Sequence, residues 1–337
     1  LPNSNTPVYA SNTIVRTSNG RTLIAANALN DTISIVDLAQ STLRDELVVG
    51  DDPRTVALTL DESRLLVTNR AEGTLAIVAL DGDEPELIAS YAVGSLPYAV
   101  VTNSNETAFV SLQGTGEVVQ VNLANGAILM RMSTPPDPSG LVLWGDFLYV
   151  THLWSGDLSL IYLPQKQVVR TIPTGQDTSL FQSFTIDPTD GRAYLPQSRS
   201  NSGNIALTYD SAIFPIVNVV DLATLGLQRQ ARIALNYADR PVNMPFSAVV
   251  DSARDLLYVV NAGSNDLSVI DLRTGVAAGH INVGTNPRGV LLSRDGNTAY
   301  VHNMIDGTLT IVDNRNLTVS DVLPISNLTI PVDILIS

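Results

Sequence analysis

The sequence has 337 residues, of which 45% are hydrophobic, so it is long enough to bury one large core or two ordinary ones. Its 33 acidic and 19 basic residues give a net charge of -14, which repels phosphate backbones and argues against nucleic acid as a partner. It contains no cysteine, which excludes disulfides, thiolate nucleophiles, cysteine-ligated metals and a covalently attached c-type haem within this chain.

One apolar strand recurs along the whole chain. Its first copy is Leu23 to Asn27, and further copies follow at intervals of roughly 40 to 45 residues, with one longer interval. Each copy leads through a polar or glycine-containing turn into a second, alternating strand, which in most units ends near Asp or Asn. Seven copies are present, ending at residues 27, 69, 112, 152, 197, 261 and 303.

A proline landmark precedes another apolar strand in most units. The first residue of a strand does not have to donate to the ladder, so proline is tolerated there. Asn-Gly and Asp-Gly pairs supply the positive φ angles that two-residue hairpin turns need. Four antiparallel strands in about 40 residues is the period of a β-propeller, and no long segment has the 3.6-residue period of a helical repeat. The landmark prolines are Pro53, Pro97, Pro138, Pro245, Pro287 and Pro331, with Phe181 in the equivalent slot of the fifth unit.

We therefore predict an all-β chain in which residues 1–337 form a single seven-bladed β-propeller with four-stranded antiparallel blades. An insertion is expected in the fifth blade at about 198–215, because the interval from Gln197 to Asn261 is about 20 residues too long. Residues 12–17 resemble the inner strand of the first blade. Residues 331–336 resemble an eighth inner strand, so eight blades are the alternative.

No apolar run approaches the roughly 18 residues that span a bilayer, so membrane insertion is not expected. The sequence begins at Leu1 without an initiator Met or a basic and apolar leader, and we interpret it as a processed or trimmed soluble chain.

Several phrases resemble the YVTN-type repeat of bacterial and archaeal surface and periplasmic propellers, and this resemblance covers nearly all of the chain. They are Tyr258 to Asn261, Val269 to Asp271, and Val283 to Gly289. A narrower stretch, 198–313, is similar to the propeller portion of proteins in which a propeller precedes a di-haem cytochrome c peroxidase-like domain. It includes Arg199 to Asn201, Pro215 to Leu222, Pro241 to Phe246, Asn261 to Asp266 and Tyr300 to Asn303.

That resemblance implies a periplasmic, secreted or cell-surface binding module that docks a c-type cytochrome or another redox protein. The sequence contains no Cys-x-x-Cys-His motif, so the haem would belong to a fused or separate partner, and no cofactor is expected in this chain. Two alternatives stay open. One is a propeller enzyme or enzyme subunit, similar to lactonases or quinoprotein dehydrogenases, and the other is a structural cell-surface repeat domain.

The motifs of self-sufficient catalysis or metal binding are missing from the sequence. The three histidines, His152, His280 and His302, fall in different units without ligand-like spacing. We expect His152 to cap a strand end, because it takes the slot that Asn holds in four other units, and His302 to face a neighbouring blade. Acidic turns such as Asp51-Asp52 and 81–84 lack the ligand spacing of a calcium loop, and solvated surface charge is the favoured interpretation.

The repeat geometry predicts a ligand or partner site at the mouth of the central channel, where the inner strands converge. Arg54 and Arg288 would lie on opposite parts of this ring and could bind a carboxylate, or else pair locally with acids such as Asp52 or Asp295. The predicted mouth residues are Arg54, Tyr98, Ser139, Gln182, Phe246 and Arg288.

Three residues are accessory candidates for the same site: His152, Trp154 and Arg199. For Trp154, packing in the core or between blades is the favoured expectation, and an aromatic contact to a ligand is the alternative.

Overall fold

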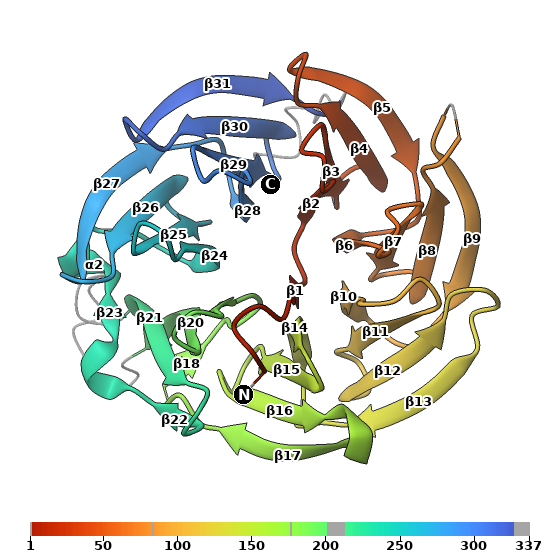
Figure 1. Cartoon of the computed structure of the whole chain (residues 1–337), viewed down its shortest axis with the longest axis horizontal. Coiled ribbons are helices and arrows are strands. Elements are labelled where there is room, and N and C mark those ends of the chain that lie inside the picture. Colours follow the sequence, from red (N-terminus) through yellow and green to blue (C-terminus); the bar gives the residue numbers. More distant parts are fainter. Residues whose placement is uncertain (1, 83, 176, 201–212, 327–337) are drawn as a thin grey trace, which may run out of the picture.

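The computed structural model describes residues 2–82, 84–175, 177–200 and 213–326. Seven antiparallel sheets are arranged as blades around a central axis, which confirms the seven-bladed propeller (Figure 1). In the described residues no helix is long and apolar enough to cross a bilayer.

Blade 1 is formed by β2 (Ile14–Arg16), β3 (Thr22–Asn27), β4 (Thr32–Asp37) and β5 (Thr42–Val48). Blade 2 is formed by β6 (Pro53–Leu58), β7 (Arg64–Asn69), β8 (Thr74–Ala79) and β9 (Glu86–Ala92). Blade 3 is formed by β10 (Pro97–Val101), β11 (Thr107–Leu112), β12 (Glu117–Asn122) and β13 (Ile128–Ser133). Blade 4 is formed by β14 (Pro138–Trp144), β15 (Phe147–His152), β16 (Leu158–Tyr162) and β17 (Gln167–Ile172), with the short 3-10 helix η1 (Leu163–Gln165) before its last strand.

Blade 5 is less regular: β18 (Thr178–Ser179) and β19 (Thr185–Asp187) both pair with β20 (Arg192–Ser200), which pairs with β21 (Ile213–Asp221). The far edge of β21 is shared by β22 (Gly226–Leu227) and β23 (Ile233–Ala234), with η2 (Arg229–Ala231) between them and α2 (Leu235–Ala238) after them. Blade 6 is formed by β24 (Pro245–Asp251), β25 (Leu256–Asn261), β26 (Asp266–Asp271) and β27 (Val276–Asn282). Blade 7 is formed by β28 (Pro287–Leu292), β29 (Thr298–Asn303), β30 (Thr308–Asp313) and β31 (Thr318–Pro324).

The core lies between blades, so the middle strands are buried on both faces. In β7, Leu65, Leu66 and Val67 are all fully buried, which explains why these strands are continuous apolar runs in the sequence. The outer strand β9 instead has five exposed and two half-buried residues, because it lies at the edge of the blade and meets solvent. The two patterns together reproduce the repeat unit that the sequence predicts.

The landmark prolines begin the inner strands β6, β10, β14, β24 and β28, and each pairs with the last residue of the second strand in its blade. A register shift follows each proline, so the ladder is interrupted where a residue cannot donate. Residue 331 lies outside the described residues.

Blade 7 closes directly against blade 1. The hydroxyl of Ser34 in β4 donates to the carbonyl of Ile325, and the hydroxyl of Ser326 donates to Glu46 at 2.8 Å. Both blades already have four strands of their own. The expected eighth inner strand at 331–336 lies outside the described residues. So does most of the expected insertion, although β20 and β21, which flank it, are longer than the other strands of the ring, at nine residues each.

An N-terminal strand crosses the channel, a feature that the repeat pattern does not predict. Strand β1 (Val8–Ala10) pairs antiparallel with β14, with Val8 opposite Trp144, and becomes a fifth, innermost strand of blade 4 (Figure 1). The chain then passes from blade 4 to β2 of blade 1. We call residues 8–13 the channel strap.

Candidate ligand cavity in the central channel

Main-chain hydrogen bonds fix the channel strap in place. The amide of Ser11 donates to the Leu141 carbonyl at 2.8 Å, and the Asn12 carbonyl accepts from the Val56 amide at 2.9 Å. The side-chain amide of Asn12 also donates to the Val290 carbonyl at 3.1 Å. The strap therefore ties blades 4, 2 and 7 together across the axis.

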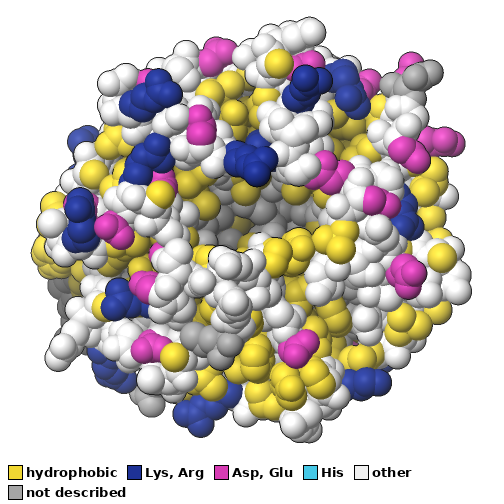
Figure 2. Space-filling view, in the orientation of Figure 1, with side chains coloured by type: hydrophobic (Ala, Val, Ile, Leu, Met, Phe, Trp, Pro, Cys, Tyr) yellow, Lys and Arg dark blue, Asp and Glu magenta, His cyan; other side chains and the backbone are white. Residues whose placement is uncertain are grey.

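The strap separates two unequal spaces. Toward the ends where the inner strands begin, a pocket of only about 10 Å³ is lined by residues including Arg54, Tyr98, Phe246 and Arg288. Toward the ends where those strands finish, a cavity of about 450 Å³ opens. We call it the channel cavity, and its volume lies within the range of small-molecule sites. Figure 2 shows that the ring is hollowed at its axis, with hydrophobic side chains on parts of the rim.

The predicted mouth residues do come together, but they mostly contact one another. The Tyr98 hydroxyl donates to Gln182 Oε1 at 2.6 Å, and the Arg288 guanidinium carbon lies 4.3 Å from the centroid of the Phe246 ring. Ser139 is fully buried, and its hydroxyl accepts from the Gln113 side chain at 2.8 Å. This end of the channel is consequently almost filled.

The two predicted arginines differ in their partners. Arg54 pairs with Asp52 at 2.7 Å, as the local alternative predicted, whereas Arg288 Nε donates to Asn286 Oδ1 at 2.6 Å instead of to an acid. Burial lowers the pKa of Arg288, and the nearby Arg54 lowers it further. Burial raises the pKa of Tyr98, which both arginines oppose. The expectation that the arginines lie on opposite parts of the ring was wrong, because blades 2 and 7 are both neighbours of blade 1.

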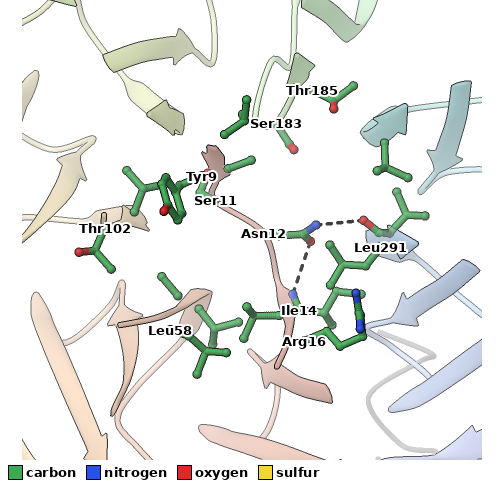
Figure 3. Close-up of a pocket in the computed structure, with 18 of the residues that line it drawn as sticks. Tyr9, Ser11, Asn12, Ile14, Arg16, Leu58, Thr102, Ser183, Thr185 and Leu291 are labelled. Atoms are coloured by element: carbon green, nitrogen blue, oxygen red, sulfur yellow. Dashed lines mark hydrogen bonds between the residues drawn. The ribbon is translucent and has the colours of Figure 1, made fainter. Parts of the chain in front are cut away.

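The channel cavity has mainly apolar walls with a few polar groups at fixed positions (Figure 3). Leu58 and Leu291 come from the ends of inner strands, and Tyr9 comes from the strap. Asn12 lies between the Val290 carbonyl and the Ile14 amide, with which it makes hydrogen bonds. Other polar side chains in the lining are Ser11, Thr59, Thr102, Ser183 and Thr185.

Two charged residues line the channel cavity, Arg16 and Glu62. Glu62 accepts a hydrogen bond from the Ser18 amide at 2.6 Å. Arg16 is half-buried and has no carboxylate within 4.0 Å in the part of the chain that the structure describes. The cavity thus has mainly apolar walls that carry one cation, Arg16, and one carboxylate, Glu62.

All three histidines have structural partners. His152 Nδ1 lies 2.9 Å from the Pro136 carbonyl and must donate to it, which leaves Nε2 to accept from the Ser159 hydroxyl at 2.8 Å. This confirms His152 as a strand-end cap, and burial lowers its pKa. His302 lies 3.0 Å from Thr13 Oγ1 at the start of blade 1, as expected for a residue that faces a neighbouring blade. His280 Nδ1 lies 2.7 Å from Asp239 Oδ2.

No metal site is assembled from the described side chains: they include no group of three or more His, Cys, Asp or Glu placed to hold an ion. Of the acidic turns, Asp52 pairs with Arg54, and the turn at 81–84 includes residue 83, which is outside the described residues.

The accessory candidates lie away from the channel cavity. Trp154 is 63% exposed on a turn of blade 4, so the favoured expectation that it packs in the core or between blades was wrong. Arg199 pairs with Asp177 at 2.9 Å, and its guanidinium lies 5.9 Å from the Phe214 ring centroid. Neither residue lines the channel cavity.

Fold and site together define a seven-bladed β-propeller with an amphipathic cavity on its axis. No family model matches the sequence, and no curated protein matches it either. Among solved structures, it is similar to hydrazine synthase of Kuenenia stuttgartiensis, with a TM-score of 0.79, 16% identity, and coverage of 93% of this chain and 97% of that one.

Two further structures have the same fold. One is a functionally unknown protein from Desulfotomaculum acetoxidans, with a TM-score of 0.67, 13% identity, and coverage of 90% of this chain and 95% of that one. The other is the dihydro-heme d1 dehydrogenase NirN in complex with DHE, with a TM-score of 0.59, 19% identity, and coverage of 93% of this chain and 66% of that one. At these identities the likeness establishes the propeller fold.

Proposed function

We propose that this chain is a non-catalytic binding propeller, located in the periplasm or outside the cell, that docks a haem-containing redox protein such as a c-type cytochrome. The observation that carries the proposal is the channel cavity of about 450 Å³, which combines apolar walls with a few fixed polar groups, as binding sites do. The described histidines, in contrast, are all engaged in contacts within the fold. The haem would belong to the partner.

The choice of partner rests on two kinds of likeness. The sequence resembles YVTN-type repeats and, between 198 and 313, propellers that precede di-haem peroxidase-like domains. The solved propellers of the same fold include a hydrazine synthase and a dihydro-heme d1 dehydrogenase. These likenesses support a haem protein as partner, whether fused or separate.

The rim of the channel cavity suits a protein partner. Leu60 lines the cavity and is 53% exposed, so a docked surface would remove its side chain from water. Arg16 would pair with a carboxylate of the partner, and a charge-assisted pair gains strength when docking excludes water. The net charge of -14 would also speed the approach of a basic partner, with an association rate that falls as salt is added.

The test is to isolate the protein from its source organism under mild conditions and to look for haem by absorbance and by haem staining after electrophoresis. We expect a haem protein at one copy per propeller, or haem on a longer form of the chain. Recovery of the propeller without haem, at every salt concentration tried, would overturn the proposal.

A matched pair of variants locates the docking face. Leu60 lies on the turn after an inner strand, whereas Leu29, 50% exposed, lies on a turn at the opposite end of the blades. Leu60→Glu should weaken the complex by roughly tenfold or more, which is about 1.4 kcal/mol, and Leu29→Glu should leave it unchanged. An equal effect of both variants would contradict docking at the cavity.

A further inference from the structure

A second pocket, separate from the channel cavity, lies between blades 4 and 5 and has a volume of about 860 Å³. Three arginines line it: Arg199 at the end of β20, Arg229 in η2 and Arg232 just after η2. The turn after β15 contributes Ser155 and Asp157 on the other side. Three arginines in one pocket stand out in a protein with a net charge of -14.

Arg232 is held in position by buried side chains. Its Nε donates to Asn218 Oδ1 at 2.7 Å, and the Asn218 side chain, which is fully buried, donates to Gln197 Oε1 at 2.6 Å. Gln197 in turn donates to the Gly156 carbonyl of blade 4 at 2.7 Å. A guanidinium anchored through Nε keeps its terminal nitrogens available, and only one of them has a further contact among the described residues, a long one of 3.5 Å to the Thr174 carbonyl.

The acids in the pocket do not balance these arginines. Asp177 pairs with Arg199 at 2.9 Å, whereas Arg229 and Arg232 have no carboxylate within 4.0 Å in the described ranges. Burial lowers the pKa of Arg232, and the like charges of Arg199 and Arg229 lower it further. A bound anion would relieve this repulsion.

We infer that this pocket binds a small oxyanion with at least two negative charges, on carboxylate or phosphate groups. Arg232 presents a fixed guanidinium to one group, and Arg229 pairs with a second group. The hydroxyl of Ser155, whose oxygen accepts from the Asp157 amide at 3.3 Å, keeps its own proton to donate to the anion.

Calorimetric titration of the intact protein at low salt tests the inference, with citrate and inorganic pyrophosphate as probes and acetate as the monovalent control. We expect saturable binding at one site for at least one of the two probes and none for acetate. Binding of citrate alone would assign carboxylates to the site, and binding of pyrophosphate alone would assign phosphates. Absence of saturable binding for both probes would overturn the inference.

Variants distinguish binding at this pocket from a general attraction between anions and the positive charges of the protein. Arg232→Gln and Arg229→Gln should each weaken binding at least tenfold. Arg192→Gln, which removes the same charge from blade 5 at a residue whose side chain is 53% exposed, should leave it unchanged. An equal loss in all three variants would mean only a diffuse attraction of anions and would overturn the inference.

A final variant, together with melting temperatures, distinguishes a lost contact to the anion from a loss of folding. Arg232→Lys keeps the charge, but one ammonium group cannot bind Asn218 and the anion in the same geometry, so binding should still fall. The melting temperature of each variant without anion reports whether the blade is intact, and the rise on adding the probe should be reduced or lost in the Arg232 and Arg229 variants and kept in Arg192→Gln.

Discussion

The Tyr98 hydroxyl donates a hydrogen bond to Gln182 Oε1 at 2.6 Å and so connects blade 3 with blade 5 at the end of the channel where the inner strands begin. Blade 4 lies between these two blades in the ring. The hydrogen bond therefore links two blades that are not neighbours in the ring, and it helps to fill this end of the channel.

Tyr98→Phe should remove this link and little else. Because Tyr98 is buried and Gln182 keeps some access to water, we expect a loss of about 1 kcal/mol in the free energy of unfolding, measured by urea titration. The control is Tyr91→Phe, whose hydroxyl donates to the Ala124 carbonyl at 3.0 Å in an exposed position and should cost less than half as much. A larger loss for Tyr91→Phe would contradict a stabilising role of the bond across the channel.

The architecture was predictable because the same local sequence features recur from blade to blade. A continuous apolar strand recurs seven times, at roughly regular intervals with one longer one, and these copies predict the seven blades. A proline where no donor is needed and Asn-Gly or Asp-Gly turns accompany it in several units. The role of the last residue of the second strand was also predictable. Its side chain donates hydrogen bonds in the blades that carry Asn27, Asn69, Asn261 and Asn303, and His152 does the same in blade 4.

The channel was harder to predict. Strand β1 precedes the first repeat and pairs with residues 142–144 through main-chain groups, which leave no pattern in the sequence. The repeat pattern therefore predicts a site at the end of the channel that the strap, Tyr98 and Arg288 fill, and gives no signal for Tyr9, Asn12 and Arg16 of the channel cavity. The relative position of Arg54 and Arg288, in contrast, was predictable from the order of the blades alone, because blades 2 and 7 are both neighbours of blade 1.

The strap depends on the absence of a side chain at Gly289. A Cβ atom there would lie 2.6 Å from Asn12 Oδ1 and closer still to Thr13 Oγ1. Gly289→Ala should therefore displace the strap and cost about 1 to 3 kcal/mol, with faster hydrogen exchange and proteolysis at residues 8–13.

Gly82→Ala is the matched control for this variant. The nearest atom to a Cβ at Gly82 is the Glu84 carbonyl oxygen at 3.4 Å, so the protein should tolerate the change. If exchange at residues 8–13 stayed slow in Gly289→Ala, the strap would not depend on this close approach.

The strand-end asparagines provide a direct comparison of charged and neutral partners. Asn261 donates to the buried Asp266 carboxylate at 2.6 Å, whereas Asn303 donates to the Thr308 and Thr310 hydroxyls at 3.0 and 2.8 Å. At neutral pH, Asn261→Ala should cost about 2 to 3 kcal/mol and Asn303→Ala about 1 to 2 kcal/mol.

The difference between these two variants should depend on pH. Burial raises the pKa of Asp266, and its bonds from Ser264 and Asn261 oppose that rise, so removing Asn261 should raise the pKa further. As pH falls and Asp266 becomes protonated, the excess cost of Asn261→Ala should shrink toward that of Asn303→Ala. Urea titrations of both variants from neutral to acidic pH measure this excess cost. An excess that stays constant with pH would exclude the Asp266 carboxylate as its cause.

His302 should make the protein less stable in acid. Burial lowers its pKa from 6.5 to about 4, so the folded protein keeps the ring neutral where the unfolded chain takes up a proton. The stability that this neutral form contributes is present above pH 6.5 and is lost as the pH falls toward 4, by about 3 kcal/mol in total. His152 contributes in the same direction, since burial lowers its pKa as well.

His302→Gln removes the titrating group and keeps a polar side chain opposite Thr13, whose hydroxyl lies 3.0 Å from the His302 ring. The free energy of unfolding of this variant should fall less steeply between pH 6.5 and 4 than that of the unmodified protein, as measured by urea titration at each pH. His302→Gln combined with His152→Gln should flatten the profile further, because unfolding would then bind two fewer protons in this range. A profile for His302→Gln as steep as the original would mean that His302 is already protonated in the fold, and that its contact with Thr13 is made by an imidazolium.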